Sequence, residues 1–252
     1  MIPRDASPTR PYIGRMLRFL IPILLIVGVV AWWKFRAQAS GNALRNGSKL
    51  LQNDHLEALF QKLADAAGVD KVEVRVLPDL NPNGLATDTG EIYVTQGFID
   101  CFRRGEVTAP ELASVAAHEM GHLALGHMKR RMIQVAGTQA AQLVLGGVLA
   151  RIIPFIGGYL AVWLLGLITA KLSRKDEFEA DAYATALMVR SGIGAEHQAR
   201  LLEKLPELIP GAVNSDSWLA SHPPSGDRAK AIRENATRWS NHAPLLERKE
   251  TP

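Results

Sequence analysis

The stretch VAAHEMGHLALGH, Val115–His127, places three histidines and a glutamate in an otherwise apolar run of thirteen residues. Imidazole and carboxylate groups are costly to bury on a helix unless a partner satisfies them. On a helix, His118 and His122 lie about 40° apart on one face, which suits two nitrogen ligands of a single metal ion. Glu119 lies between them, and the HExxH pattern gives it the role of general base. The alternative is a pair of hydrogen-bonded histidines on a core helix without a metal.

The helix that carries this stretch is predicted to begin at Thr108, where Thr108 and Glu111 form a capping-box signature, and to run to about Arg131. A catalytic zinc takes three protein ligands and keeps one position open. His127 is nine residues after His118, so on a continuous helix it faces the opposite side. We therefore expect His127 to mark a helix end or contact a partner, and not to bind the metal.

A better third ligand lies downstream, in the segment DEFEADAYA. Glu177 and Asp181 again have helical i, i+4 spacing. Glu177 can bind the metal while Asp181 accepts a hydrogen bond from the second nitrogen of a ligand histidine. Glu179 is rotated about 200° from Glu177 and is expected to face away. A charged, solvated helix face explains these acids equally well on the sequence alone.

The composition excludes several classes of protein. The chain has 252 residues, of which 47% are hydrophobic and 21% charged, so it is neither disordered nor fibrous. Its net charge of +4 is spread over small clusters without interleaved aromatic residues, so nucleic acid is not an expected partner. Cys101 is the single cysteine, which excludes an internal disulfide and a thiolate metal cluster, and we interpret it as a small buried hydrophobe.

An apolar run near the N-terminus, Phe19–Trp33, predicts a membrane anchor. If Arg18 and Lys34 extend their charges to the interfaces, the segment reaches about twenty residues, enough to cross a bilayer. The rival is a cleaved signal peptide, because AQA at 37–39 resembles a cleavage site. We expect an N-terminal tail (1–15), a transmembrane anchor (16–36) and a polar linker (37–53).

The remaining chain predicts an α+β domain over 54–240, mainly helical with a small sheet, and a C-terminal tail over 241–252. DHLEALFQKLADAAGV, 54–69, has the apolar period of an amphipathic helix that ends near Gly68. KVEVRVL, 71–77, and EIYVT, 91–95, predict two strands separated by a turn-rich loop.

A second apolar region, 135–172, separates the two halves of the predicted metal site. Both halves must lie on one side of a membrane, so the region crosses it twice or not at all. Two spans, 135–150 and 152–172, would meet around Arg151. With no span, the region is a hydrophobic cover over the active site that docks on the membrane surface, and we favour this second interpretation.

Four motifs in one order resemble a known family. HEMGH is followed by SRKDEFEADAYA; NGLATDTGEIYVTQGFI (83–99) precedes them and SHPPSGDR (221–228) follows. Together they are similar to the membrane-associated zinc metalloproteases that include the HtpX-like heat-shock proteases and the CAAX prenyl proteases, over about residues 54–238. The resemblance implies a zincin-like gluzincin domain with one Zn²⁺ per chain.

The resemblance assigns roles to individual residues. It makes His118, His122 and Glu177 the zinc ligands and Glu119 the catalytic base. It also implies a transition-state role near the His-Pro motif, so His222 is the candidate partner of the oxyanion, with Arg228 in support. His222 has two alternative roles, as a turn residue beside two prolines or as an additional metal contact that gates the site.

These assignments predict a zinc metalloendopeptidase. The strand with Ile92, Tyr93 and Val94, and Asn83 before it, is expected to hold an extended polypeptide by strand addition. Family analogy points to quality control of unfolded or misassembled proteins, at the bacterial inner membrane and on its extracytoplasmic side. The charges that flank the anchor do not decide the side, and a spanning hairpin would argue for the cytoplasm. The alternative functions are a zinc-binding chaperone or adaptor without proteolysis, and a structural membrane protein.

Overall fold

The computed structural model describes residues 38–87, 89–209, 222 and 226–242, together with seven helical residues between 24 and 36. The expected N-terminal tail, most of the expected anchor and the C-terminal tail beyond 242 lie outside the described residues. The chain divides into two compact units, Met1–Gly47 and Ser48–Pro252. Within the first unit, residues 38–46 are helical, whereas the sequence predicted a polar linker there.

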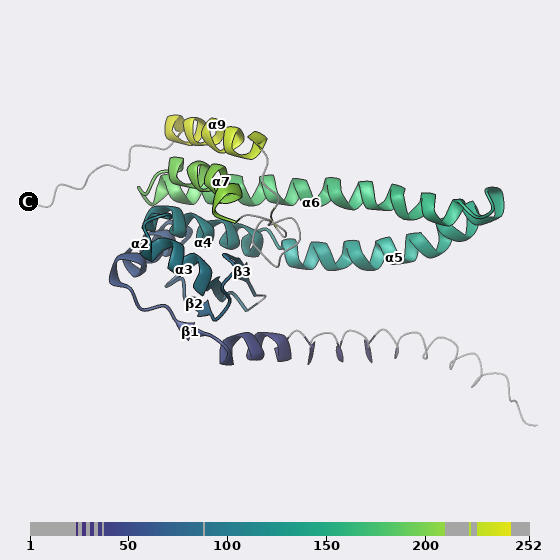
Figure 1. The fold of residues 1–252 in the computed structure, drawn as a ribbon, viewed down its shortest axis with the longest axis horizontal. Helices are drawn as coiled ribbons and strands as arrows, with labels where there is room; N and C mark the ends of the chain where they lie inside the picture. Colours follow the sequence, from purple (N-terminus) through teal and green to yellow (C-terminus); the bar gives the residue numbers. More distant parts are fainter. Residues whose placement is uncertain are drawn as a thin grey trace, which may run out of the picture. The chain divides into compact units, whose positions relative to one another are not determined.

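The second unit is mainly helical with a small mixed sheet, which confirms the expected α+β class (Figure 1). Its elements are, in chain order, β1 (Lys49–Leu50), α2 (Asp54–Ala67), β2 (Val74–Leu77), β3 (Gly84–Ala86), β4 (Ile92–Thr95), α3 (Gln96–Arg103), α4 (Ala109–Ala124), α5 (His127–Ile152), α6 (Gly157–Arg190), α7 (Glu196–Leu208) and α9 (Gly226–His242).

Helix α2 forms where its apolar period predicted it. Asn53 caps its first turn by accepting a hydrogen bond from the Leu56 backbone N–H at 3.0 Å. Gly68 ends the helix in the left-handed conformation, with φ of 73°, which glycine adopts without a Cβ clash. The face that carries Phe60 and Leu63 is buried in the core.

The sheet has the strand order β1-β2-β4-β3, with β2 and β4 parallel and the other pairs antiparallel. The sequence missed β1, which falls in the expected linker, and β3, which falls in the expected loop. Asn83 ties β3 to β4, because its carbonyl accepts from the Thr95 N–H at 2.9 Å and its own N–H donates to Thr95 Oγ1 at 2.8 Å. These bonds turn a segment of loop-like composition into a strand.

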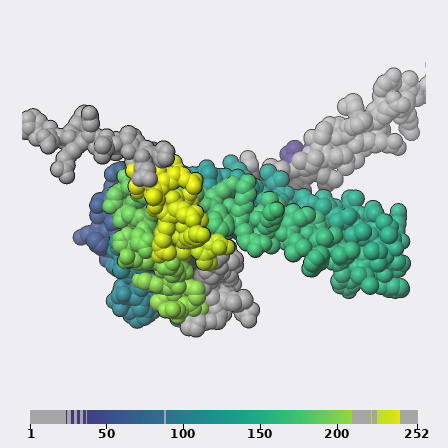
Figure 2. All heavy atoms as spheres, turned by 90° about the horizontal axis from the view of Figure 1, so that it is seen from above, coloured from purple at the N-terminus to yellow at the C-terminus, as the bar shows by residue number. Residues whose placement is uncertain are grey.

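Helix α4 is the buried centre of the unit. Thr108 and Glu111 form the predicted capping box, and Lys204 of α7 approaches Glu111 Oε1 at 2.7 Å. From Ala109 to His122, every residue except Pro110 is buried, because α4 packs against α2, α6 and α7. Helix α9 covers α6 and α7 in turn (Figures 1 and 2).

The predicted helix end at about Arg131 is wrong. Helix α4 stops at Ala124, Gly126 adopts a left-handed conformation with φ of 65°, and α5 begins at His127. A single left-handed residue redirects the chain, so the angular estimate that placed His127 opposite His118 does not apply.

Helices α5 and α6 form a long hairpin whose far end extends beyond the body of the unit (Figures 1 and 2). The turn between them lies at 153–156, and Gly157 follows it in direct contact with the Leu149 carbonyl, where a side chain would not fit. Leu143, Trp163 and Phe155 are 81%, 60% and 96% exposed. Among the described residues, α5 is the one helix that is long and apolar enough to cross a membrane.

Candidate metal centre

The centre forms where α4 crosses α6. Gly121 of the HEMGH segment meets the backbone of Ala180, and a Cβ at Gly121 would lie 2.8 Å from the Ala180 carbonyl oxygen. This close approach brings His118 and His122 on α4 against Glu177 and Asp181 on α6. The two halves of the predicted site, which are 55 residues apart from His122 to Glu177, therefore meet through a glycine contact.

Three predicted ligands face one another at distances that suit a shared metal. His118 Nε2 and His122 Nε2 are 3.1 Å apart. Glu177 Oε2 is 3.4 Å from His118 Nε2, and Glu177 Oε1 is 3.5 Å from His122 Nε2. Ligand atoms at about 2.1 Å from a tetrahedral metal lie about 3.4 Å apart. All three residues are at most 8% exposed.

The residues present fit a divalent cation on two grounds. Among the described residues, Glu177 Oε1 is the buried side-chain nitrogen or oxygen atom that lacks a hydrogen-bond partner. A buried carboxylate oxygen without a donor is costly unless a cation satisfies it. The cluster also combines the carboxylates of Glu119, Glu177 and Asp181 with one guanidinium, Arg228, so the site lacks about two positive charges when its histidines are neutral.

Asp181 occupies the position expected of a residue that orients a ligand. His118 Nδ1–H donates to Asp181 Oδ1 at 3.0 Å, so the other ring nitrogen, Nε2, faces the ligand cluster. Arg228 holds the same carboxylate through Nε at 2.6 Å and Nη2 at 3.0 Å. Arg228 is 2% exposed, and its buried charge is balanced by Asp181 and by Glu177, whose Oε2 lies 3.3 Å from Arg228 Nη1.

The pKa values follow from these contacts. Burial would raise the pKa of Glu177 and Asp181, but His118 lowers both, aided by His222 at Glu177 and by Arg228 at Asp181. Burial would lower the pKa of His118, but the carboxylates of Asp181 and Glu177 raise it to about 9. Burial and then the neighbouring His118 lower the pKa of His122 to about 2. The acids are thus anions and His122 presents a lone pair, which are the forms that bind a cation, whereas His118 releases a proton when its Nε2 binds one.

His222 lies inside the cluster. Its Nδ1 is 2.9 Å from Glu177 Oε2 and 3.2 Å from His118 Nε2. Its Nε2 is 3.6 Å from Glu119 Oε1, and Glu119 is 3% exposed. One ligand atom from each of His118, His122, Glu177 and His222 can be chosen so that all four lie within 4.8 Å of one another. This position favours a metal contact over a simple turn residue.

A second group of chelating side chains adjoins the first and was not predicted. His127 Nδ1 is 2.8 Å from His122 Nδ1, and His127 Nε2 is 3.2 Å from Glu179 Oε2. Glu179 does point away from the ligand cluster, but it contacts His127 rather than solvent alone. The expectation that His127 faces away from the ligands is wrong, because it assumed one helix across Gly126. A glycine late in the apolar period was the available signal of that break.

The expected substrate strand is not at an edge of the sheet. Ile92, Tyr93 and Val94 belong to β4, which pairs with β2 on one side and β3 on the other, and all three are at most 1% exposed. Strand addition requires a free edge. Asn83 precedes β3, which is the edge strand beside α4.

Comparison with known proteins agrees with this geometry. The chain is 33% identical to metalloprotease LoiP of Escherichia coli (strain K12) over 179 residues, 71% of this chain and 68% of the relative. It is 32% identical to metalloprotease YcaL of the same organism over 195 residues, 77% and 74% of the two chains. Protease HtpX of Alcanivorax borkumensis is 29% identical over 246 residues, 84% and 79% of the two chains. The family model of peptidase family M48 matches residues 50–236, so the chain belongs to that family of metallopeptidases.

Proposed function

We propose that the protein is a zinc-dependent endopeptidase in which His118, His122 and Glu177 bind the metal. The observation that carries this proposal is the buried Glu177 Oε1, which has no hydrogen-bond partner among the described residues and lies 3.5 Å from His122 Nε2. Two imidazoles and one carboxylate are a ligand set of catalytic zinc.

We assign the remaining steps of peptide hydrolysis to Glu119 and His222. When bound, the metal supplies Lewis-acid chemistry, which activates water and polarises the scissile carbonyl. Glu119 accepts the proton of the attacking water and transfers it to the leaving amine. His222 reaches the ligand cluster through Nδ1 and Glu119 through Nε2. If its ring turns out of the cluster, a ligand position opens and the imidazole becomes available to the developing oxyanion.

The substrate is a polypeptide, and we propose that it binds in an extended form along β3. Strand β3 (Gly84–Ala86) offers a sheet edge beside the helix that carries His118, and this edge replaces β4 as the docking strand. An extended substrate must be unfolded or flexible over the segment that pairs. This requirement supports a role in clearing unfolded or misassembled proteins.

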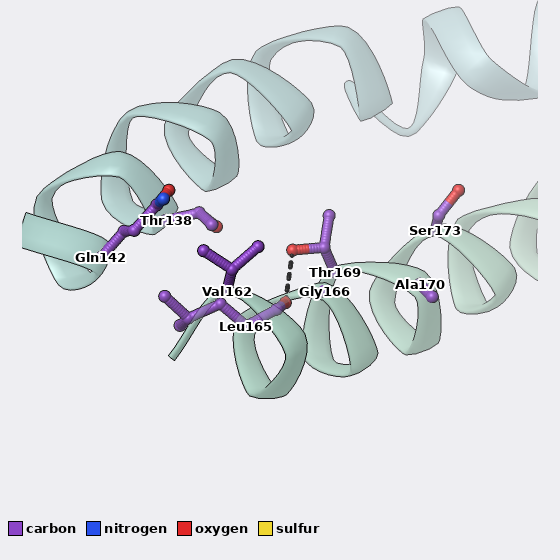
Figure 3. A pocket seen from close by; sticks show the side chains of 8 residues that line it. All are labelled: Thr138, Gln142, Val162, Leu165, Gly166, Thr169, Ala170 and Ser173. Carbon is purple, nitrogen blue, oxygen red and sulfur yellow. Dashed lines mark hydrogen bonds between the residues drawn. The ribbon is translucent and has the colours of Figure 1, made fainter. Parts of the chain in front are cut away.

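The hairpin supports a membrane location. The groove between α5 and α6 is lined by the polar or small residues Thr138, Gln142, Gly166, Thr169, Ala170 and Ser173, together with Val162 and Leu165 (Figure 3). Large apolar residues such as Leu143 and Trp163 point outward instead. A helix pair in water has the opposite arrangement, whereas polar and small residues between helices with apolar residues outside are typical of lipid surroundings.

The basic residues at the base of the hairpin bear on the side of the membrane. The exposed ones are Lys129, Arg131, Lys171, Arg174 and Lys175. The charge-free part of α6, 157–170, is about 21 Å long, so crossing a core of about 30 Å requires Lys171 and Arg151 to extend toward the two interfaces. If the hairpin crosses, these charges favour a cytoplasmic catalytic domain. We prefer this argument to the extracytoplasmic expectation, which rested on analogy.

The test is zinc content and casein cleavage of the detergent-purified chain. We expect the wild type to hold one zinc and to cut. Glu119→Gln should keep zinc and lose cleavage about a hundredfold or more, because the general base is gone. Glu177→Ala should lose the metal, and the exposed His55→Ala on α2 should match the wild type. If the wild type binds no zinc and all variants behave alike, the proposal fails; zinc without cleavage would indicate a binding protein.

A further inference from the structure

A histidine outside the ligand set holds one of the ligands. His127 is 3% exposed, and its Nδ1 lies 2.8 Å from His122 Nδ1, on the side of the His122 ring opposite the ligand cluster. The other nitrogen of His127 lies 3.2 Å from Glu179 Oε2. Both ring nitrogens of a buried histidine are therefore engaged, although neither faces the predicted metal.

Ligand geometry determines where the hydrogens lie in this chain of contacts. If His122 binds the metal through Nε2, its hydrogen is on Nδ1. That Nδ1–H donates to His127 Nδ1, which must then be an acceptor. The hydrogen of His127 is consequently on Nε2, where Glu179 accepts it. One tautomer of each ring satisfies every contact from His122 to the carboxylate.

Glu179 is itself fixed in position. Arg130 Nη1 donates to Glu179 Oε2 and to Asp176 Oδ1, at 2.7 Å each. His127, Asp176 and Glu179 are close enough to one another to hold a metal of their own. However, Arg130 already supplies a positive charge to both carboxylates, so this group is better explained as a support than as a second metal site.

We propose that His127 and Glu179 form a relay that sets the tautomer and ring orientation of His122 and thereby strengthens metal binding. His118 receives the same support directly from the carboxylate of Asp181. Groups that hold the second nitrogen of a ligand histidine typically change metal affinity 10–100-fold when removed. This inference rests on the proposed function, since it requires His122 to be a ligand.

The experiment measures the affinity of the detergent-purified full chain for Zn²⁺ by competition with a chelator. His127→Leu removes both contacts at similar volume and should weaken Zn²⁺ binding about 10–100-fold. His127→Asn can place its amide oxygen near the Nδ1 position and should recover most of the affinity. Glu179→Ala should weaken binding less than His127→Leu, and His55→Ala serves as the control. Thermal unfolding in excess chelator should show a cooperative transition for every variant, which establishes that each is folded.

Each outcome decides the inference. Wild-type affinity in a folded His127→Leu variant overturns it. An Asn variant as weak as the Leu variant also overturns it, because His127 would then act through packing alone. If His127→Leu does not fold, Glu179→Ala decides in its place, because the Glu179 side chain is 31% exposed in the wild type. Unchanged Zn²⁺ affinity in Glu179→Ala would then overturn the inference. A wild type that takes up no Zn²⁺ defeats the proposed function itself, which is a distinguishable result.

Discussion

Replacing Gly121 with alanine should loosen the contact that brings the two halves of the metal site together. An added Cβ would lie 2.8 Å from the oxygen and 3.0 Å from the Cα of Ala180. Both are backbone atoms of α6, so no side-chain rotation relieves the overlap, and α4 and α6 must separate by about half an ångström. His122 is the next residue along α4, so the separation moves it away from Glu177.

The magnitude follows from two opposing effects. Overpacking of this kind costs about 1–3 kcal/mol, while alanine is about 1 kcal/mol better than glycine inside a helix. The net loss at Gly121 is about 1 kcal/mol. Gly137 on α5 is a matched control, because a Cβ there meets no atom within 4 Å. Gly137→Ala should gain up to about 1 kcal/mol, so the two variants should differ by about 2 kcal/mol, or about 4–8 °C in Tm.

Thermal unfolding in chelator and casein cleavage with zinc measure the two consequences. Gly121→Ala should unfold at the lower temperature and cleave about tenfold more slowly or worse, because small displacements of reacting groups reduce rates steeply. Gly137→Ala should cleave like the wild type. Equal midpoints and equal cleavage in the two variants would refute the argument that the Gly121 contact sets the distance between the ligands.

Two further predictions concern the helix cap and the hairpin. Glu111→Gln should destabilise the chain by about 1 kcal/mol at pH 7, because glutamine can still complete the capping box of α4 but loses the ion pair with Lys204, which is partly exposed. Burial would raise the pKa of Glu111, but Lys204 and Thr108 lower it in the folded state. The extra stability of the wild type over Glu111→Gln is therefore complete above about pH 4.3 and disappears as the pH falls through the lower folded-state pKa. Urea unfolding of both proteins from pH 7 to 3 measures this difference. Phe155→Cys at the hairpin turn and Leu80→Cys in the body, 96% and 79% exposed, should react with a membrane-impermeant maleimide from opposite sides if the hairpin crosses; reaction from one side would contradict crossing.

Local patterns predicted the start of the metal-binding helix, and nonlocal contacts explain what they missed. The cap at Thr108 and the spacing of His118 and His122 depend on residues within one or two helical turns, so both features can be predicted from the local sequence alone. Strand β3 depends on its pairing with Thr95 of β4, and its residues, Gly84–Ala86, have the composition of a turn. A three-residue strand that owes its conformation to a partner leaves no period to detect.

The direction of the His127 side chain was mispredicted for a related reason, although its expected place at a helix end is confirmed, since α5 begins there. The apolar period continues past Gly126, and glycine is tolerated in helices at a cost of about 1 kcal/mol, so sequence reasoning favoured a continuous helix. In the structure, α4 ends at Ala124 and tertiary contacts stabilise a separate helix, α5, after Gly126. His127 begins α5 at a position where it reaches both His122 and Glu179, and these contacts exist only once α5 and α6 are paired.

The same contacts explain how a long apolar hairpin can separate two halves of one metal site. The hairpin joins the body at a cross-link of Arg130 to Asp176 and Glu179, with His127 beside it. This cross-link holds the first turn of α5 against α6 immediately next to the ligands. The geometry of the site is therefore fixed at the base of the hairpin and does not depend on the length of the hairpin. In the proposed membrane location, the exposed helices beyond the cross-link contact lipid while Glu177 and His122 keep their separation.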